Sequence, residues 1–126
     1  MGHQKLRCYW MLLEIAKAVP ALIRRLPRGN GHIIDQLKRA LESSILNLCE
    51  GNGSLPCRPA LPEAKGGQGT SIKERNRFFD ISLGSLAEVD SCFGILAAYG
   101  YITPAYEHDM RCDLIVICKM IENLKS

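Results

Sequence analysis

Apolar residues in this chain recur at intervals of three and four along four separate stretches, and no sustained run alternates between apolar and polar residues. Spacings of three and four place side chains on one face of a helix, whereas a half-buried strand needs alternation. The four stretches cover residues of about 4–26, 33–50, 71–99 and 104–124. This periodicity predicts an all-α chain.

Residues typical of helix ends flank these stretches. Ser71 and Glu74 have the spacing of a capping box, in which the two residues satisfy each other's free backbone donors. Thr103 precedes Pro104, a cap residue followed by proline at the first helical position. Pro20 lies inside the first predicted helix, where it removes a backbone donor and should kink the helix.

The links between the predicted helices suggest their topology. Residues 52–70 hold three prolines and four glycines, so we predict a long mobile loop there. The other two links are short, which favours antiparallel neighbours. At 126 residues the chain has the size of one domain. We therefore predict a single domain over residues 1–126, an antiparallel up-down-up-down four-helix bundle.

Polar side chains interrupt the second and third predicted helices where packing against a neighbouring helix favours apolar ones. They are Arg39, Ser43, Asn47 and Glu50 on the second helix, and Arg77, Asp80, Gly84 and Glu88 on the third. Each set recurs at three and four and so lies on one helical face. We call the two sets together the polar stripe.

One antiparallel register pairs the whole polar stripe, because paired residue numbers then add up to 127. The pairs are Glu50 with Arg77, Asn47 with Asp80, Ser43 with Gly84, and Arg39 with Glu88. Two of them join opposite charges, which predicts ion pairs between the helices. The small residues Ser43 and Gly84 would mark the closest approach of the two backbones.

The polar stripe has three possible roles. It can hold ion pairs that tie two helices, form an oligomer interface or ligand site, or form a catalytic site. Catalysis is the weakest of these, because Glu50 and Glu88 would lie about 16 Å apart along the axis. They could not act together on one substrate atom.

The six cysteines, at positions 8, 49, 57, 92, 112 and 118, form no CxxC pair. No histidine lies at ligand spacing from two of them, so we expect no metal site and no cofactor. Arg7, Glu14 and Lys17 interrupt the first apolar stretch, which argues against a signal peptide or a membrane span there. We expect reduced, mostly buried thiols in a cytoplasmic protein that does not bind membranes.

Basic residues gather at both ends of the predicted bundle. One group holds Arg24, Arg25, Arg28 and Lys38, and the other Lys73 and Arg75. The plain interpretation is solvated charge, and lysine or arginine near a helix C-terminus also complements the helix dipole. The functional one is binding to phosphate backbones with little sequence readout. Most of the few aromatic residues fall on apolar faces, which argues against specific single-strand recognition.

The first predicted helix is apolar around much of its circumference. Leu6, Trp10, Leu13 and Ile15 cannot all share a core face with the remaining apolar residues of that helix. Extra apolar surface on a small protein is typical of an interface. We therefore expect self-association.

The polar stripe also carries a resemblance to a known family. One helix signature of that family matches the second predicted helix at Gln36 to Ala40, Ser43, Asn47 and Glu50 to Gly53. A second signature matches the third predicted helix at Lys73 to Phe79, Ile81 and Gly84 to Glu88. The turn before the last helix matches at Gly100 to Ile102. In these residues the chain resembles the four-helix bundle proteins encoded as intervening sequences in bacterial ribosomal RNA genes. These are similar to the accessory variability proteins of diversity-generating retroelements, which assist a reverse transcriptase. The resemblance implies a barrel-like homopentamer without known enzymatic activity and with a role in nucleic-acid binding.

We therefore expect a non-enzymatic, homo-oligomeric accessory protein that binds the DNA or RNA backbone, with a reverse transcriptase as one possible partner. The alternative is an oligomeric protein-interaction scaffold that does not bind nucleic acid. A small enzyme that uses the region of Arg39 and Glu88 is the third hypothesis.

Overall fold

The structure, a computed structural model, describes residues 2–53 and 71–126, with side chains from Lys5 onward in the first range. Over these residues the chain forms four α-helices and no strand. The helices are α1 (Gly2–Arg25), α2 (Gly31–Asn52), α4 (Ile72–Ala98) and α5 (Pro104–Leu124). The all-α prediction is confirmed for this part of the chain. The helix ends differ from the expected ones by two residues at most.

The boundary between α2 and the following link differs from the sequence prediction. Asn52 is the last residue of α2, and Gly53 caps the helix with a φ of 83°. That left-handed conformation favours glycine. The predicted mobile loop at 52–70 thus loses its first residue to the helix, and residues 54–70 lie outside the described residues. α1 continues through Pro20, which is exposed.

The two N-caps are confirmed, although only one of the two hydrogen bonds of the Ser71–Glu74 capping box forms among the described residues. The Ser71 side-chain oxygen accepts a hydrogen bond from the backbone N–H of Glu74 at 3.1 Å. The Thr103 hydroxyl accepts one from the N–H of Tyr106 at 3.1 Å, and Pro104 is the first residue of α5. Each bond satisfies a backbone donor that the first helical turn leaves free.

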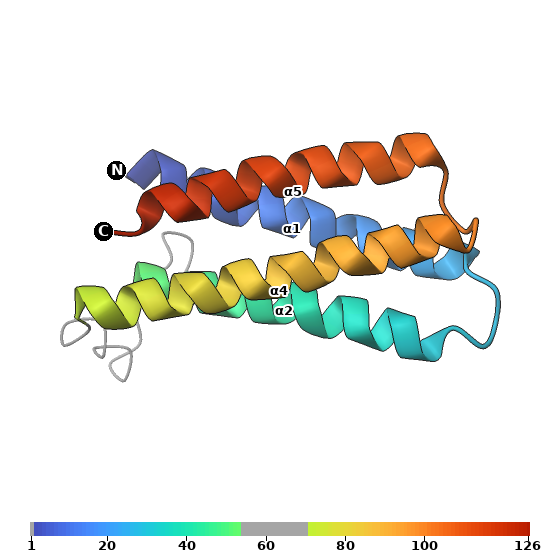
Figure 1. The fold of residues 1–126 in the computed structure, drawn as a ribbon, viewed down its shortest axis with the longest axis horizontal. Coiled ribbons are helices and arrows are strands. Elements are labelled where there is room, and N and C mark those ends of the chain that lie inside the picture. The colour runs from blue at the N-terminus through green and yellow to red at the C-terminus, as the bar shows by residue number, and fades with distance from the viewer. Residues whose placement is uncertain (1, 54–70) are drawn as a thin grey trace.

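Each helix packs mainly against two others. α1 contacts α2 and α5, and α4 contacts the same two helices, so α1 and α4 lie diagonally opposite each other. Figure 1 shows the chain termini, the end of α2 and the start of α4 at one end of the molecule. The short links at 26–30 and 99–103 lie at the other end, which we call the turn end.

The core takes buried residues from all four helices, among them Leu12, Leu48, Phe93 and Ile117. The most extensive contact joins α2 and α4. A Cβ atom added at Gly51 would lie only 2.5 Å from Cε1 of Phe79. Glycine is therefore what lets α2 approach the Phe79 ring so closely.

Candidate functional site

Hydrogen bonds between small residues define how α2 and α4 meet. The hydroxyl oxygens of Ser43 and Ser85 lie 2.8 Å apart, and the Ser82 hydroxyl donates to the backbone oxygen of Ser44 at 2.7 Å. The Ser44 and Ser82 side chains are fully buried. In these two pairs the residue numbers add up to 128 and 126, against 127 in the predicted register. The two helices are thus neighbours, within one residue of that register.

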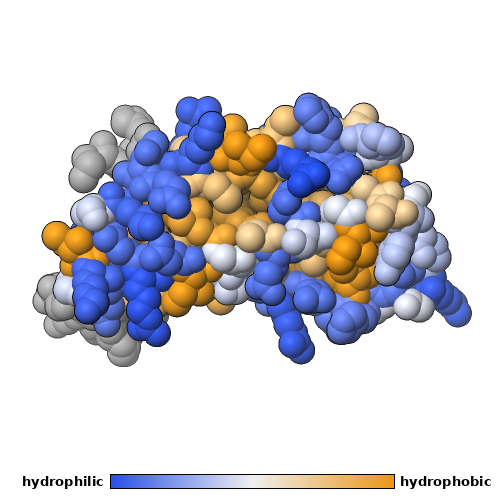
Figure 2. Space-filling model, in the orientation of Figure 1, coloured by the Kyte–Doolittle hydropathy of each residue, from blue (hydrophilic) through white to orange (hydrophobic). Residues whose placement is uncertain are grey.

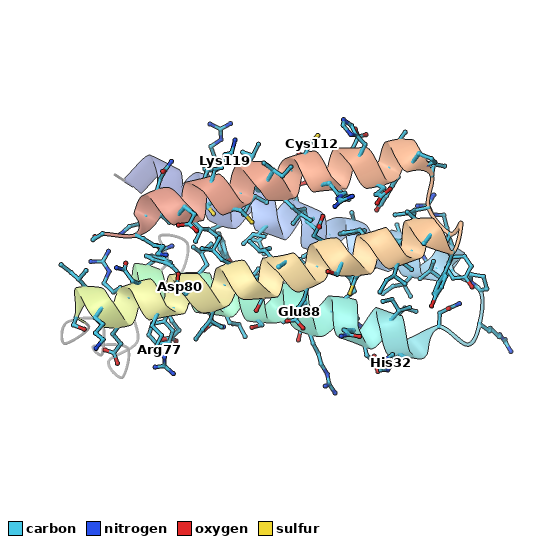
Figure 3. All side chains as sticks on the ribbon, in the orientation of Figure 1. His32, Arg77, Asp80, Glu88, Cys112 and Lys119 are labelled. Carbon is cyan, nitrogen blue, oxygen red and sulfur yellow. The ribbon has the colours of Figure 1, made fainter. Side chains whose placement is uncertain are left out.

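The predicted ion pairs of the polar stripe are wrong. Arg39, Glu50, Arg77 and Glu88 are all exposed, and none takes part in an ion pair with a described residue. Figure 3 shows Arg77 and Glu88 along the edge of α4 that faces α2. At such an edge both charges stay in water, where a surface ion pair gains little over hydration.

The two inner pairs of the stripe also differ from the prediction. The Asn47 side-chain amide donates to the backbone oxygen of Ser43 at 2.8 Å, within its own helix. Asp80 instead forms an ion pair of 2.7 Å with Lys125 beyond the end of α5. A Cβ added at Gly84 would meet no atom within 4 Å. Gly84 therefore does not mark a close contact between the helices, whereas the serines form hydrogen bonds across the junction.

A polar cleft lies between α2 and α4 near the turn end. It has a volume of about 460 Å³ and is lined by His32, Asp35, Gln36, Arg39, Ala40, Ser43 and Glu88. The two charged stripe residues in it are exposed. The cleft therefore presents solvated charges from both helices.

The basic residues fall into two kinds. Arg24, Arg25, Arg28, Lys38 and Lys73 are exposed. None of them forms an ion pair with a described carboxylate. Arg25 lies over the Tyr106 ring, and the charges of the other four are available to an anionic ligand.

Arg75 belongs to the second kind. It is half-buried, and its Nε donates to the backbone oxygen of Gly51 at 3.3 Å. The last carbonyls of a helix have no partner within the helix, and a basic side chain can satisfy them. Arg75 thus stabilises the C-terminal end of α2, a role that sequence analysis missed because it depends on how α2 and α4 pack.

Two aromatic side chains are exposed at the surface. Trp10 is 43% exposed and Tyr99 is 61% exposed. The Tyr99 ring packs edge-on against Tyr101, with centroids 5.6 Å apart. The Arg25 guanidinium lies 5.7 Å from the centre of the Tyr106 ring, a cation–π geometry. Burial raises the pKa of the Tyr106 hydroxyl, and the Arg25 charge opposes this rise.

Positive charge is concentrated on α1. This helix holds five basic residues and one acidic residue, so its net charge is +4 with histidine neutral. Acidic residues outnumber basic ones in α2, α4 and α5. In a chain whose net charge is only +3, a strongly basic α1 therefore stands beside three acidic helices and forms a basic side of the molecule. This asymmetry does not show in whole-chain composition.

The apolar surface lies elsewhere than expected. In α1, Ile15 is buried and Leu6 and Leu13 are half-buried, so the predicted excess on this helix shrinks to Trp10. α4 and α5 instead expose five large apolar side chains: Ile72 (58%), Ile81 (37%), Ile95 (41%), Ile115 (55%) and Val116 (42%). Figure 2 shows apolar surface over both helices. Among the described helices, α4 is the one that is long and apolar enough to span a membrane by length and composition. In its most apolar segment, 39% is buried within the bundle.

The five described cysteines differ in burial. Cys8 and Cys92 are buried, Cys49 and Cys118 are half-buried, Cys112 is exposed, and Cys57 lies outside the described residues. Burial raises the pKa of the Cys8 thiol to about 12, with a smaller contribution from Cys118. Such a thiol stays protonated and inert at neutral pH.

A scan against models of known protein families found no match, and a search of curated protein sequences found none either.

Proposed function

We propose that this chain is the subunit of a non-enzymatic homo-oligomer that binds the backbone of DNA or RNA with little sequence specificity. In this proposal the subunit is an antiparallel up-down-up-down bundle, and copies assemble into a closed ring, with five subunits preferred. The protein would act in the cytoplasm as an accessory factor, with a reverse transcriptase as one possible partner.

The observation that carries the proposal is the uncompensated positive charge of α1 and the turn after it. Arg24, Arg25 and Arg28 follow one another there, exposed and without a carboxylate partner among the described residues. Arginines in this state attract phosphates by releasing condensed counterions, whatever the base sequence. A ring of five chains would multiply the charge of +3 to +15.

The exposed apolar side chains of α4 and α5 support self-association. Monomers seldom expose contiguous apolar surface on a large scale, and such surface is typical of an interface. Because α4 lies diagonally opposite α1, an interface on α4 would leave the basic side of the subunit free. A head-to-tail interface forms a ring when its rotation closes.

The polar stripe is the part of the chain that resembles the intervening-sequence and retroelement accessory proteins, and this resemblance supports both the pentamer and the link to a reverse transcriptase. The exposed stripe residues and the adjoining cleft would then belong to a surface for a partner or a neighbouring subunit. Residues that stay solvated in the single chain are suited to such a contact.

Two measurements test the proposal together. Light scattering at micromolar concentration should give a mass several times that of the 14.0 kDa chain. Fluorescence anisotropy with labelled duplex and single-stranded oligonucleotides should show binding at low salt, with little dependence on sequence. A monomer that binds neither oligonucleotide would refute the proposal.

The second candidate is an oligomeric protein-interaction scaffold, which the exposed apolar side chains favour equally. The two candidates differ in one result. An oligomer that binds no nucleic acid at low salt would be a scaffold, and its basic side would be solvated charge only.

A further inference from the structure

The turn end combines basic and aromatic side chains from two separate links. Arg24, Arg25 and Arg28 come from the end of α1 and the link after it. Tyr99 and Tyr101 come from the link between α4 and α5. Figure 1 shows both links at the same end of the molecule. Basic groups interleaved with aromatic rings are the usual components of single-strand binding surfaces.

The backbone around Tyr99 is well fixed although its ring is exposed. The N–H of Tyr99 donates to the oxygen of Ile95, and the N–H of Tyr101 donates to the oxygen of Leu96, both at 2.9 Å. Between them Gly100 has a φ of 78° and turns the chain. The edge-on contact with Tyr101 orients the Tyr99 ring. The ring is thus held in place while 61% of the residue remains accessible.

The unpaired positive charge at the turn end is unevenly distributed. Arg25 is committed to the Tyr106 ring, whereas Arg24 and Arg28 contact no described carboxylate. On α5, Glu107 forms an ion pair with Arg111 at 3.4 Å, and Asp90 of α4 pairs with the same arginine. Asp35 lines the cleft between α2 and α4. The unpaired positive charge is therefore on the side of α1.

We propose that the turn end binds single-stranded nucleic acid, with a base stacked on the Tyr99 ring and neighbouring phosphates held by Arg24 and Arg28. This inference rests on the proposed nucleic-acid binding and adds a preference to it. Bases in a duplex are stacked on each other and cannot cover a protein ring, whereas those of a single strand can. Stacking is tolerant of sequence, because every base has a π face.

The single tryptophan of the chain makes a direct test possible. Trp10 lies in the first half of α1, away from the turn end. In a Trp10→Phe, Tyr99→Trp variant the only tryptophan reports on the proposed stacking site. Addition of an oligothymidylate or oligouridylate of about 16 nucleotides should quench this fluorescence, and a blunt duplex of equal length should quench it far less. The emission of Trp10 in the native protein should change little, which provides the matched control.

Two substitutions separate stacking from the hydroxyl group. Tyr99→Ala should weaken oligothymidylate binding by about 5-fold or more, the effect of losing one stacked base. Tyr99→Phe keeps the ring and should bind like the native protein. Because Tyr99 is exposed, neither change should disturb folding, and circular dichroism can verify this.

The outcomes distinguish this inference from the proposed function. The inference is overturned if labelled oligothymidylate binds without quenching the Trp10→Phe, Tyr99→Trp variant and Tyr99→Ala binds as tightly as the native protein. Backbone binding would then stand. Equal affinity for duplex and single strand overturns it in the same way. If acrylamide cannot quench the fluorescence of the free Trp10→Phe, Tyr99→Trp variant, the site is covered by another subunit and the inference is wrong. No binding to either oligonucleotide overturns the proposed function as well.

Discussion

The hydroxyl oxygens of Ser43 and Ser85 lie 2.8 Å apart across the junction of α2 and α4. Large apolar side chains would hold the two helices further apart at this level. Ser44 and Ser82 continue the junction with a second hydrogen bond, in which both residues are fully buried. A buried hydroxyl is tolerated when it is hydrogen-bonded. The junction is therefore close and polar at its centre, and the charged stripe residues lie outside it.

Two glycines at this junction should respond in opposite ways to alanine. Gly51→Ala places a methyl group 2.5 Å from the Phe79 ring, and it should lower the free energy of unfolding by about 1–3 kcal/mol through overpacking. Gly84→Ala meets no atom within 4 Å and should raise it by up to about 1 kcal/mol through helix propensity. Urea denaturation of both variants measures the difference. Equal effects would show that the backbones do not approach as described.

The stripe charges should contribute little to stability. Arg39 and Glu88 are exposed and unpaired among the described residues. Glu88→Ala should therefore change the free energy of unfolding by less than about 1 kcal/mol, whereas a buried ion pair would lose about 3–5 kcal/mol. Arg39→Ala should behave alike, and the double variant should be additive. A large loss of unfolding free energy in each single variant, with a non-additive double variant, would instead show that Arg39 and Glu88 form the ion pair that the sequence suggested.

Stability should fall at alkaline pH because of the buried thiol of Cys8. Its pKa is about 12 in the folded protein against an ordinary value of 9.0. Between these values the unfolded chain loses the proton while the folded chain keeps it, so stability is full below pH 9 and declines as pH rises toward 12. The shift corresponds to about 4 kcal/mol over the whole window.

Denaturation curves from pH 8 to pH 11 can test this alkaline effect. Cys8→Ala should flatten the decline, and part of it should remain, because burial also raises the pKa of Cys92 and Cys118. Cys112→Ala is the matched control, since Cys112 is exposed. An unchanged pH dependence in Cys8→Ala would contradict the assignment.

The exposed apolar side chains of α4 and α5 should control self-association. Ile115 is 55% exposed and Leu46, on α2, is 60% exposed. Ile115→Lys places a charge among the apolar residues of α5 and should lower the mass found by light scattering. Leu46→Lys adds the same charge at similar exposure on another helix, and it should leave the mass unchanged. If only Leu46→Lys dissociates the assembly, the interface lies on α2 instead.

The sequence predicted the helices well because local signals specify them. The hydroxyl caps of Ser71 and Thr103 act within one turn, so spacing alone reveals them. The register of α2 and α4 was also accessible, since small and polar residues repeat on both helices. The ion pairs could not be predicted, because a register gives the level of a side chain along the helix but not whether it points into the junction or into water. Ser85 points into the junction, whereas Gly84, one position earlier, faces open space.

The candidate site was only partly predictable for a similar reason. Arg24, Arg25 and Arg28 are adjacent in sequence, and so their clustering was visible. Tyr99 could not be singled out from the sequence, because it stands at the end of the helix predicted at 71–99 and most of the aromatic residues fall on apolar faces. Its proximity to the basic end depends on how four helices pack. Arg75 was assigned to ligand binding, although it satisfies a carbonyl of α2.

The salt dependence of nucleic-acid binding tests the central proposal most directly. For the native protein, the logarithm of the binding constant for a labelled oligonucleotide should fall linearly with the logarithm of salt concentration, with a slope of about −0.9 per phosphate contact on duplex DNA. Reversing Arg24 and Arg28 to glutamate, and leaving Arg25 on Tyr106, should weaken binding for all sequences and flatten this slope by up to about 1.8. Arg77→Glu with Lys119→Glu reverses the same number of charges on α4 and α5 and should flatten it much less. No binding at low salt, or equal slopes in the two variants, would contradict the proposal.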